Sequence, residues 1–168
     1  MIVLGVLKYY RIMIVSFPID PRSIMTNQVG DIVRKFFEQF ERNSNTFAGE
    51  PIARQFSNPF LSADPHGVTY AVSANELIES IVKRKAFFTS IGFQWLKIRV
   101  LETQNLDDQY SLAKTQATMQ FKKSSGETVD VTSYSTYILY MKNTLPMIVF
   151  STTHEDLMKI MKENGLIP

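Results

Sequence analysis

The chain has 168 residues, of which 45% are apolar and 20% are charged, a composition typical of one globular domain with a sizeable core. It contains no cysteine, which excludes disulfide bonds, thiolate metal sites and a cysteine nucleophile, and which fits a reducing compartment, so we expect a cytoplasmic protein. The net charge of +2 comes from residues 1–24, and the neutral remainder gives no reason to expect nucleic-acid binding.

Residues 1–24 differ in pattern from the rest of the chain. Two short apolar runs flank the segment Lys8–Arg11. A secretory signal would place its charge first, and neither run is long enough to span a bilayer, so neither a signal peptide nor a membrane-spanning segment is expected. An extra strand, a weak membrane-surface anchor and an over-long start remain open as interpretations. We favour a natural start at Met13 or Met25, with one domain over residues 25–168.

A helix is predicted from Thr26 onward. Its apolar residues recur at helical spacing from Val29 to Phe40, and this stripe includes Phe36 and Phe37. Such a stripe is typical of a helix that closes over a core. A Phe of this stripe could also face a ligand.

A short strand is predicted next, because Ile52, Arg54 and Phe56 alternate with smaller or polar residues. Arg54 would then share a face with two apolar side chains. It could bind a ligand carboxylate there, although an arginine in this setting more often snorkels to water or pairs with an internal acid.

The middle of the chain contains two predicted turns and a second helix. Asn58-Pro59 and Asp64–Gly67 have turn composition. Ser73 and Glu76 have the spacing of a capping box, which predicts a helix that Gly92 ends. The basic residues 83–85 of this helix are expected mostly on its solvated face.

The last part of the chain is predicted to be sheet. Long alternating segments joined by turns indicate antiparallel strands with one face covered by helices. These strands are expected at Phe93–Thr103, Tyr110–Lys122, Thr128–Met141 and Pro146–Ser151. A closing helix is expected to start at Thr152 or Thr153, which would place His154 in its first turn.

This order of elements, over residues 25–168, resembles the nuclear-transport-factor-2-like superfamily, which includes ketosteroid isomerases, scytalone dehydratases and SnoaL-like polyketide cyclases. The resemblance implies a cystatin-like α+β cone, in which a strongly curved antiparallel sheet wraps around N-terminal helices and a central pocket. It does not fix a function. The segments most similar to bacterial members of unassigned function are residues Asn58–Val68, Ser135–Leu139, Ile148–Phe150 and His154–Leu157.

Catalytic candidates are few. The two histidines lie far apart in sequence, no metal-ligand motif is present, and we expect neither a metal nor another cofactor. Glu102 is the only carboxylate in the expected inward register of the sheet. The sharpest catalytic hypothesis is Asp64 with His66 in a turn at the pocket mouth, although such a turn also uses Asp to cap its own backbone.

The sequence favours binding of a small molecule in an apolar pocket. Lyase or isomerase chemistry on a small hydrophobic carbonyl or hydroxy compound is the alternative, and whether the protein is an enzyme stays open. A homodimer through the open sheet face, which would carry Gln116, Thr118 and Gln120, is also expected. The candidate ligand-binding residues are Phe36, Phe40, Phe56, Phe60, Tyr70, Trp95 and Tyr134, with Arg54 as the charged anchor.

Overall fold

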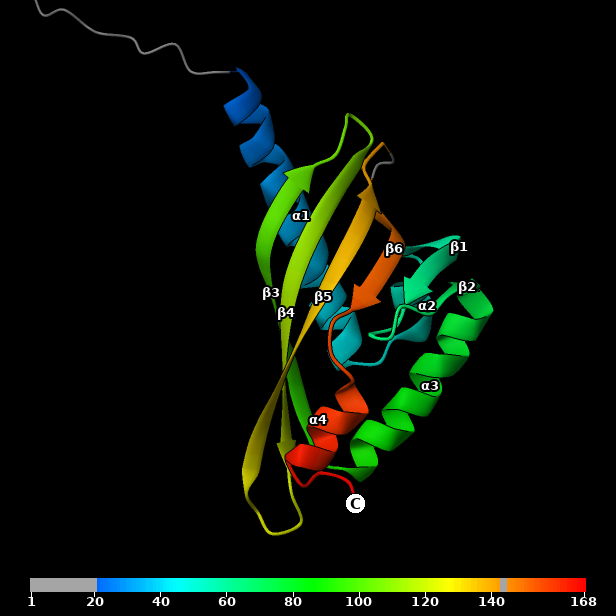
Figure 1. The fold of residues 1–168 in the computed structure, drawn as a ribbon, viewed down its shortest axis with the longest axis vertical. Coiled ribbons are helices and arrows are strands. Elements are labelled where there is room, and N and C mark those ends of the chain that lie inside the picture. The colour runs from blue at the N-terminus through cyan, green and yellow to red at the C-terminus, as the bar shows by residue number, and fades with distance from the viewer. Residues whose placement is uncertain (1–20, 143–144) are drawn as a thin grey trace, which may run out of the picture.

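The computed structural model describes residues 21–142 and 145–168, and within them six strands form one curved sheet accompanied by four helices (Figure 1). The predicted leader falls largely on residues 1–20, which lie outside the described part. The helices are α1 (Pro21–Asn45), α2 (Gly49–Ala53), α3 (Ala74–Ser90) and α4 (Leu157–Glu163). The strands are β1 (Phe56–Ala63), β2 (Thr69–Val72), β3 (Phe93–Asn105), β4 (Tyr110–Lys122), β5 (Thr128–Tyr140) and β6 (Met147–Thr153).

The sheet has the order β2-β1-β6-β5-β4-β3. The consecutive strands β3 to β6 pair antiparallel, as the alternating segments predicted. The prediction of a wholly antiparallel sheet is wrong at one pair, because β1 lies parallel to β6. The chain between these two strands is long enough to make the return that parallel pairing needs. The predicted α+β architecture with a strongly curved sheet is confirmed.

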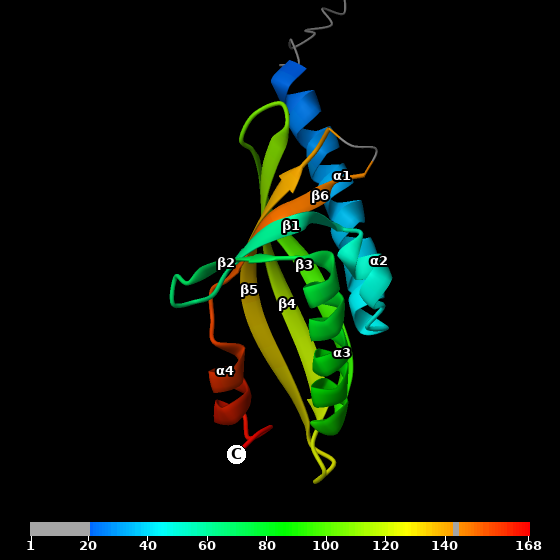
Figure 2. The same cartoon turned by 90° about the vertical axis from the view of Figure 1, so that its right-hand side faces the viewer.

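The helices lie on the side toward which the sheet curves. α1 runs beside β3, and α3 stands apart from the long strands and leans over the concave side (Figure 2). The apolar stripe of α1 packs onto the sheet through Val33, Phe36 and Phe37, which contact Ala113 and Leu139 in one buried cluster. This packing fixes α1, because aromatic side chains remove large apolar areas from water.

Two local predictions are wrong between residues 49 and 63. The strand expected from Ile52 begins only at Phe56, because Gly49–Ala53 form the helix α2, whose five residues are too few for helical periodicity to show in the sequence. Asn58-Pro59 is not a turn but part of β1, where the pairing with β6 shifts register between Phe56 and Leu61. A proline lacks the N–H for a sheet hydrogen bond and is tolerated at such an irregularity.

Both terminal helices begin at other residues than predicted. α1 starts at Pro21 rather than Thr26. α4 starts after Asp156, whose carboxylate accepts hydrogen bonds from the backbone N–H groups of Met158 (2.9 Å) and Lys159 (3.2 Å). Aspartate is a strong N-cap, so Thr152 and Thr153 stay in β6 and His154 lies before the helix.

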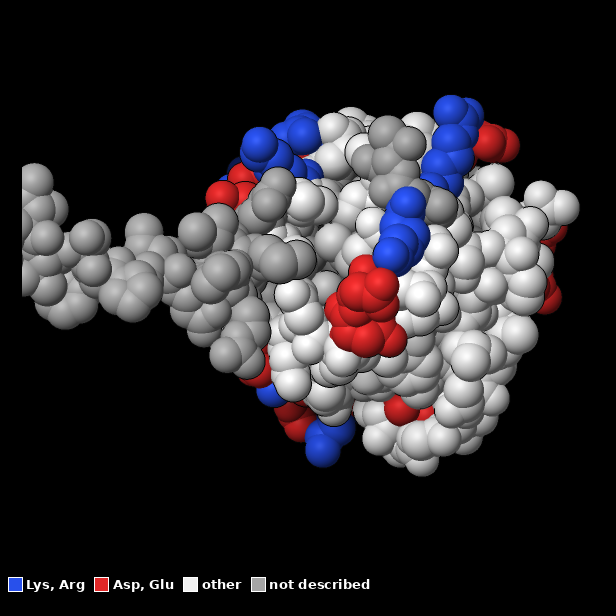
Figure 3. All heavy atoms as spheres, turned by 90° about the horizontal axis from the view of Figure 1, so that it is seen from above, with Lys and Arg blue, Asp and Glu red and all other residues white. Residues whose placement is uncertain are grey.

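Acidic and basic side chains lie next to one another on the face shown in Figure 3, rather than gathering by sign. Within the described residues, no helix combines the length and the apolar character that crossing a membrane would require.

The ends of α3 are fixed by the predicted features. Ser73 and Glu76 form the capping box at its start. At its end Gly92 has a φ of 86°, and its carbonyl accepts a 2.7 Å hydrogen bond from the N–H of Lys122. A Cβ atom at Gly92 would lie 2.0 Å from the carbonyl oxygen of Lys122, so this position requires glycine for two separate reasons.

Gly92→Ala should therefore destabilise the fold more than Gly126→Ala, a matched control in a hairpin turn. Gly126 has a similar φ of 90° but no atom within 4 Å of its added Cβ. The control should lose about 1–2 kcal/mol from backbone strain alone, and Gly92→Ala at least about 1 kcal/mol more from the clash. Urea unfolding of both variants measures the difference. Equal losses would contradict a tight contact between residue 92 and β4.

Candidate ligand-binding cavity

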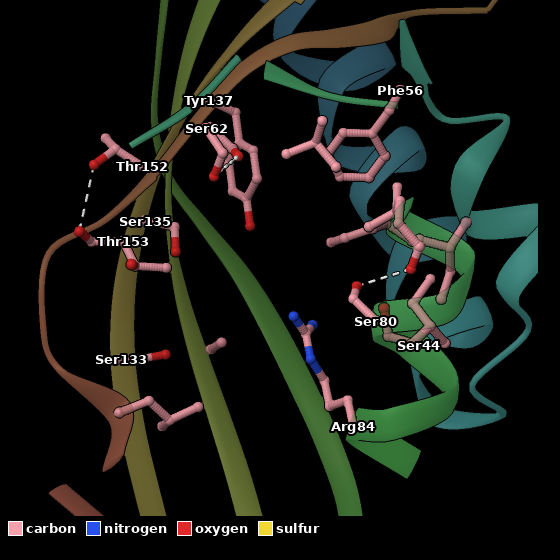
Figure 4. Close-up of a pocket in the computed structure, with 18 of the residues that line it drawn as sticks. Ser44, Phe56, Ser62, Ser80, Arg84, Ser133, Ser135, Tyr137, Thr152 and Thr153 are labelled. Carbon is pink, nitrogen blue, oxygen red and sulfur yellow. Dashed lines mark hydrogen bonds between the residues drawn. The ribbon is translucent and has the colours of Figure 1, made fainter. Parts of the chain in front are cut away.

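A cavity of about 620 Å³ lies between the concave face of the sheet and helix α3. Its walls come from every strand, from α2, α3 and α4, and from the C-terminal part of α1 with the turn that follows. Figure 4 shows the strands on one side of this space and α3 on the other. The cavity is therefore a product of the whole fold rather than of a single loop.

One part of the cavity wall is apolar and largely aromatic. Phe56 and Phe60 lie side by side, with ring centroids 4.4 Å apart, and Phe40 contacts Phe56 at 5.9 Å. These rings fix one another's positions, so this wall has a defined shape. The apolar lining consists of Phe40, Phe47, Ile52, Phe56, Phe60, Leu77, Ile81, Phe88, Phe93, Leu96, Ile98, Met119 and Leu157, with smaller contributions from Ala63, Ala71, Val72 and Ala117.

The opposite wall carries hydroxyl groups. Ser133, Ser135 and Tyr137 alternate along β5, which places all three side chains on its inner face. Ser151 of β6 donates a long hydrogen bond of 3.5 Å to the hydroxyl of Ser62 on β1. These groups give the sheet side of the cavity several donors and acceptors, as Figure 4 shows.

Arg84 brings a positive charge into the cavity from α3. It follows Ile81 by three residues and precedes Phe88 by four, so it lies on the same helix face as these two buried side chains. Figure 4 shows its guanidinium group pointing from α3 across the cavity toward β5. Residues 83–85 were expected mostly on a solvated face, and all three are accessible to water, but Arg84 alone among them lines the cavity. Its place in the apolar stripe was the signal in the sequence that could have identified it.

No acidic group of the part of the chain that the structure describes pairs with Arg84. Among the described residues, its guanidinium group takes part in no hydrogen bond and in no ion pair within 4.0 Å. The side chain of Arg84 is accessible to water, and the surface that it exposes faces the cavity. Protein atoms surround it on the other sides. Burial lowers the pKa of Arg84 below its ordinary value, while the hydroxyl groups of Tyr137 and Tyr70 act in the opposite direction.

The two carboxylates that line the cavity are engaged elsewhere. Glu76 accepts hydrogen bonds from the backbone N–H of Ser73 (2.8 Å) and from its hydroxyl (2.7 Å), and these bonds lower the pKa of the Glu76 carboxyl. Asp64 accepts hydrogen bonds from the N–H groups of His66 and Val68, each at 2.9 Å. Neither carboxylate therefore neutralises Arg84.

The hydroxyl group of Tyr137 also lines the cavity, and protein atoms surround it closely. Burial raises the pKa of its hydroxyl above the ordinary value. Hydrogen bonding to Ser135, the charge of Arg84 and hydrogen bonding to Thr115 act against this shift. The phenol is consequently neutral at neutral pH, and it can donate one hydrogen bond to a molecule in the cavity.

The structure places some of the predicted ligand-binding residues in the cavity and others outside it. Phe40, Phe56, Phe60 and Tyr70 line the cavity. Phe36 is part of the buried cluster beneath α1, and Trp95 and Tyr134 lie on the outer face of the sheet, 38% and 40% exposed. Arg54 follows α2 as an exposed side chain, 3.7 Å from Glu50, and does not line the cavity. The short helix turned Arg54 away from the position that a strand would have given it.

The predicted catalytic pair is only partly brought together. Asp64 lines the cavity, whereas His66 lies exposed in the turn. Their recorded contact joins the Asp64 carboxylate to the backbone N–H of His66, which is the turn-capping arrangement. The catalytic role of this pair stays a prediction.

Other titratable groups lie outside the cavity. A register shift between Val100 and Glu102 places Glu102 opposite Lys114 on the outer face, where the two form a 2.8 Å ion pair, so the inward register expected for Glu102 is wrong. His154 lies 2.8 Å from the hydroxyl of Thr136. Over residues 21–142 and 145–168 no group of three or more histidine or acidic residues is arranged to hold a metal ion.

Comparison with known proteins identifies the fold. No family model and no curated protein matches the sequence. A domain of unknown function with a cystatin-like fold from Nostoc punctiforme is 18% identical, with a TM-score of 0.57 over 81% of this chain and 83% of that one. An NTF2-like protein with a cystatin-like fold from Novosphingobium aromaticivorans is 8% identical, with a TM-score of 0.59 over 88% and 94%.

The chain has the nuclear-transport-factor-2-like fold. A ketosteroid isomerase-like protein from Erwinia carotovora atroseptica shares it as well, at 7% identity and a TM-score of 0.57 over 75% of this chain and 96% of that one. The suspected resemblance is thereby confirmed at the level of the fold. At such identities the likeness extends to architecture alone, so the function has to be argued from the cavity.

The unpaired charge predicts that Arg84 lowers the stability of the empty protein. Arg84→Met keeps a long side chain but removes an unpaired charge from the cavity, so the free energy of unfolding should rise, by less than about 1 kcal/mol because the side chain is accessible to water. Lys83→Met, on the exposed neighbouring position, should change it by less than about 0.5 kcal/mol. Urea unfolding of ligand-free protein is the measurement. A loss of stability in Arg84→Met would mean that a protein group compensates the charge.

Proposed function

We propose that this protein binds a small, mainly apolar molecule inside the cavity. The observation that carries the proposal is the cavity itself, whose volume of about 620 Å³ is typical of sites for small organic ligands. Its lining combines an aromatic wall with a few convergent polar groups. The apolar part would supply affinity, because each 100 Å² of apolar surface removed from water contributes roughly 2.5 kcal/mol before the entropy cost of association.

Lyase or isomerase chemistry on a small carbonyl or hydroxy compound is the second candidate. It is favoured by the presence of a carboxylate, Asp64, in the lining of the same cavity as the Tyr137 hydroxyl and the Arg84 guanidinium. A base and donors for a developing oxyanion are the groups that proton transfer next to a carbonyl requires. Any molecule found in the cavity would be the first substrate to test for this chemistry.

Occupancy of the cavity can be measured directly. Native mass spectrometry of protein purified gently from its source should reveal a defined extra mass that disappears on denaturation. The neutral probe 2-(2-naphthyl)ethanol should bind the ligand-free protein, as followed by naphthalene fluorescence. Absence of both the extra mass and the probe signal would contradict the proposed function.

Ala117→Leu should weaken binding of this neutral probe about tenfold or more, because Ala117 lines the cavity and the larger side chain fills part of it. Ala86→Leu is the matched control, since Ala86 is exposed on α3 and does not line the cavity. The control should bind the probe with unchanged affinity. Equal affinities of the two variants for the probe would mean that the probe binds outside the cavity.

We also propose that the protein acts in the cytoplasm, because its lack of cysteine fits a reducing environment.

We further propose that two copies associate through the outer face of the sheet. The outer face carries Trp95 and Tyr134 with polar neighbours. The Trp95 ring N–H donates a 3.1 Å hydrogen bond to Gln120, and Gln116 donates to the Tyr134 hydroxyl at 3.2 Å. Aromatic groups held in place by amides suit a self-complementary interface around a twofold axis.

Trp95→Glu should convert the proposed dimer to a monomer, because it would place a charge in the centre of the interface on both copies. Val82→Glu is the control, since Val82 is 63% exposed and belongs to α3, a helix on the concave side of the sheet (Figure 2). Light scattering after size-exclusion chromatography measures both masses. A native protein that runs as a monomer at all concentrations, or a dimeric Trp95→Glu variant, would refute this interface.

A further inference from the structure

We propose that the molecule bound in the cavity carries a single negative charge, as an aryl or alkyl carboxylate, and that Arg84 pairs with this carboxylate. The inference rests on the proposed function and adds the chemical class of the ligand. It starts from a cation in the wall of the cavity that pairs with no acidic group among the described residues.

The charge of Arg84 is positioned for a ligand rather than for the fold. A guanidinium group stays protonated in proteins, so it brings a full positive charge into the cavity. The neighbouring helix positions show that the charge could have been placed in solvent, since Lys83 and Lys85 are exposed and do not line the cavity. The two lining carboxylates, Asp64 and Glu76, are held by backbone N–H groups of their own turns.

The surroundings of Arg84 complete a carboxylate site. A carboxylate accepts about four hydrogen bonds, of which a planar guanidinium group can supply two in parallel. The hydroxyl groups of Tyr137, Ser135 and Ser133 face Arg84 from the sheet side of the cavity (Figure 4). They can supply the remaining donors. The neutral state of the Tyr137 phenol, favoured by its burial, suits it as a donor to an anion.

The number of charges favours a monoanion. Arg84 is the only basic residue among the described residues that line the cavity. The second charge of a phosphate dianion would therefore be buried without a partner, which is costly. The remaining wall is largely aromatic, so the rest of the molecule is expected to be apolar.

A set of four naphthyl probes tests this inference: 2-naphthylacetate, 2-(2-naphthyl)ethanol, 2-(2-naphthyl)ethylamine and 2-naphthyl phosphate. They share one apolar body and differ in the charge of the head group. Isothermal titration of the native protein should give the tightest binding for the acetate, about tenfold to a hundredfold tighter than for the alcohol, with the amine weakest. The phosphate should bind less tightly than the acetate.

Arg84→Gln should abolish the preference for the acetate over the alcohol, so that the ratio of the two affinities falls to within about threefold of one. Lys83→Gln removes the same charge from the exposed neighbouring position, and it should retain the preference. These two variants separate pairing with Arg84 from a general effect of net charge.

The outcomes distinguish the two proposals. Equal binding of acetate and alcohol, or a preference that survives in Arg84→Gln, would overturn the carboxylate inference and leave the binding function intact. Tighter binding of the phosphate would overturn the assignment of a single charge. Binding of none of the four probes to the native protein would refute the binding function itself.

Discussion

The cavity depends on how helix α3 is held: both of its ends contact the sheet, and Leu77, Ile78 and Ile81 pack against α2 and β1. At its start, the N–H of Ala74 donates a 3.0 Å hydrogen bond to the Asn58 side chain of β1. At its end, Phe88 packs against Phe93 and Phe121 of the sheet, with ring centroids 5.6 and 5.5 Å apart. Beyond these contacts the long strands curve away from the helix, so the side chain of Arg84 borders the cavity instead of a strand.

Two aromatic clusters on either side of the cavity contribute to the stability of the fold. One includes Phe56 and Phe60 of β1, the other includes Phe88 and Phe93 near the end of α3, and Phe47 packs against both. Each buries large rings against the other elements, so the molecule does not require a filled centre. The position of Arg84 between the clusters then follows a common pattern, in which a binding site accepts a locally unfavourable group that the surrounding packing can offset.

The sequence predicted the sheet better than it predicted the cavity. The long strands β3 to β5 were found nearly to the residue, because alternation over thirteen positions cannot be mistaken for a helix. α2 was missed, since five residues show no period. Arg84 was grouped with the lysines beside it, which were expected mostly on the solvated face, although its spacing from Ile81 and Phe88 indicated the inner face. Trp95 and Tyr134 were placed in the pocket by their aromatic character, which does not tell one face of a strand from the other.

Side chains of β5 point alternately to the cavity and to the outer face of the sheet, so this one strand contributes to both proposed binding surfaces. Ser133, Ser135 and Tyr137 face the cavity, while Tyr134 lies between them on the outer face. A shift of this strand by one residue would exchange all of these side chains, so the same hydrogen bonds to β4 and β6 fix the hydroxyl wall and the outer surface together. A second copy packed on the outer face would further restrict β5 and with it the donors opposite Arg84. Association of two copies and binding of the ligand would thus both depend on β5, through side chains on its opposite faces.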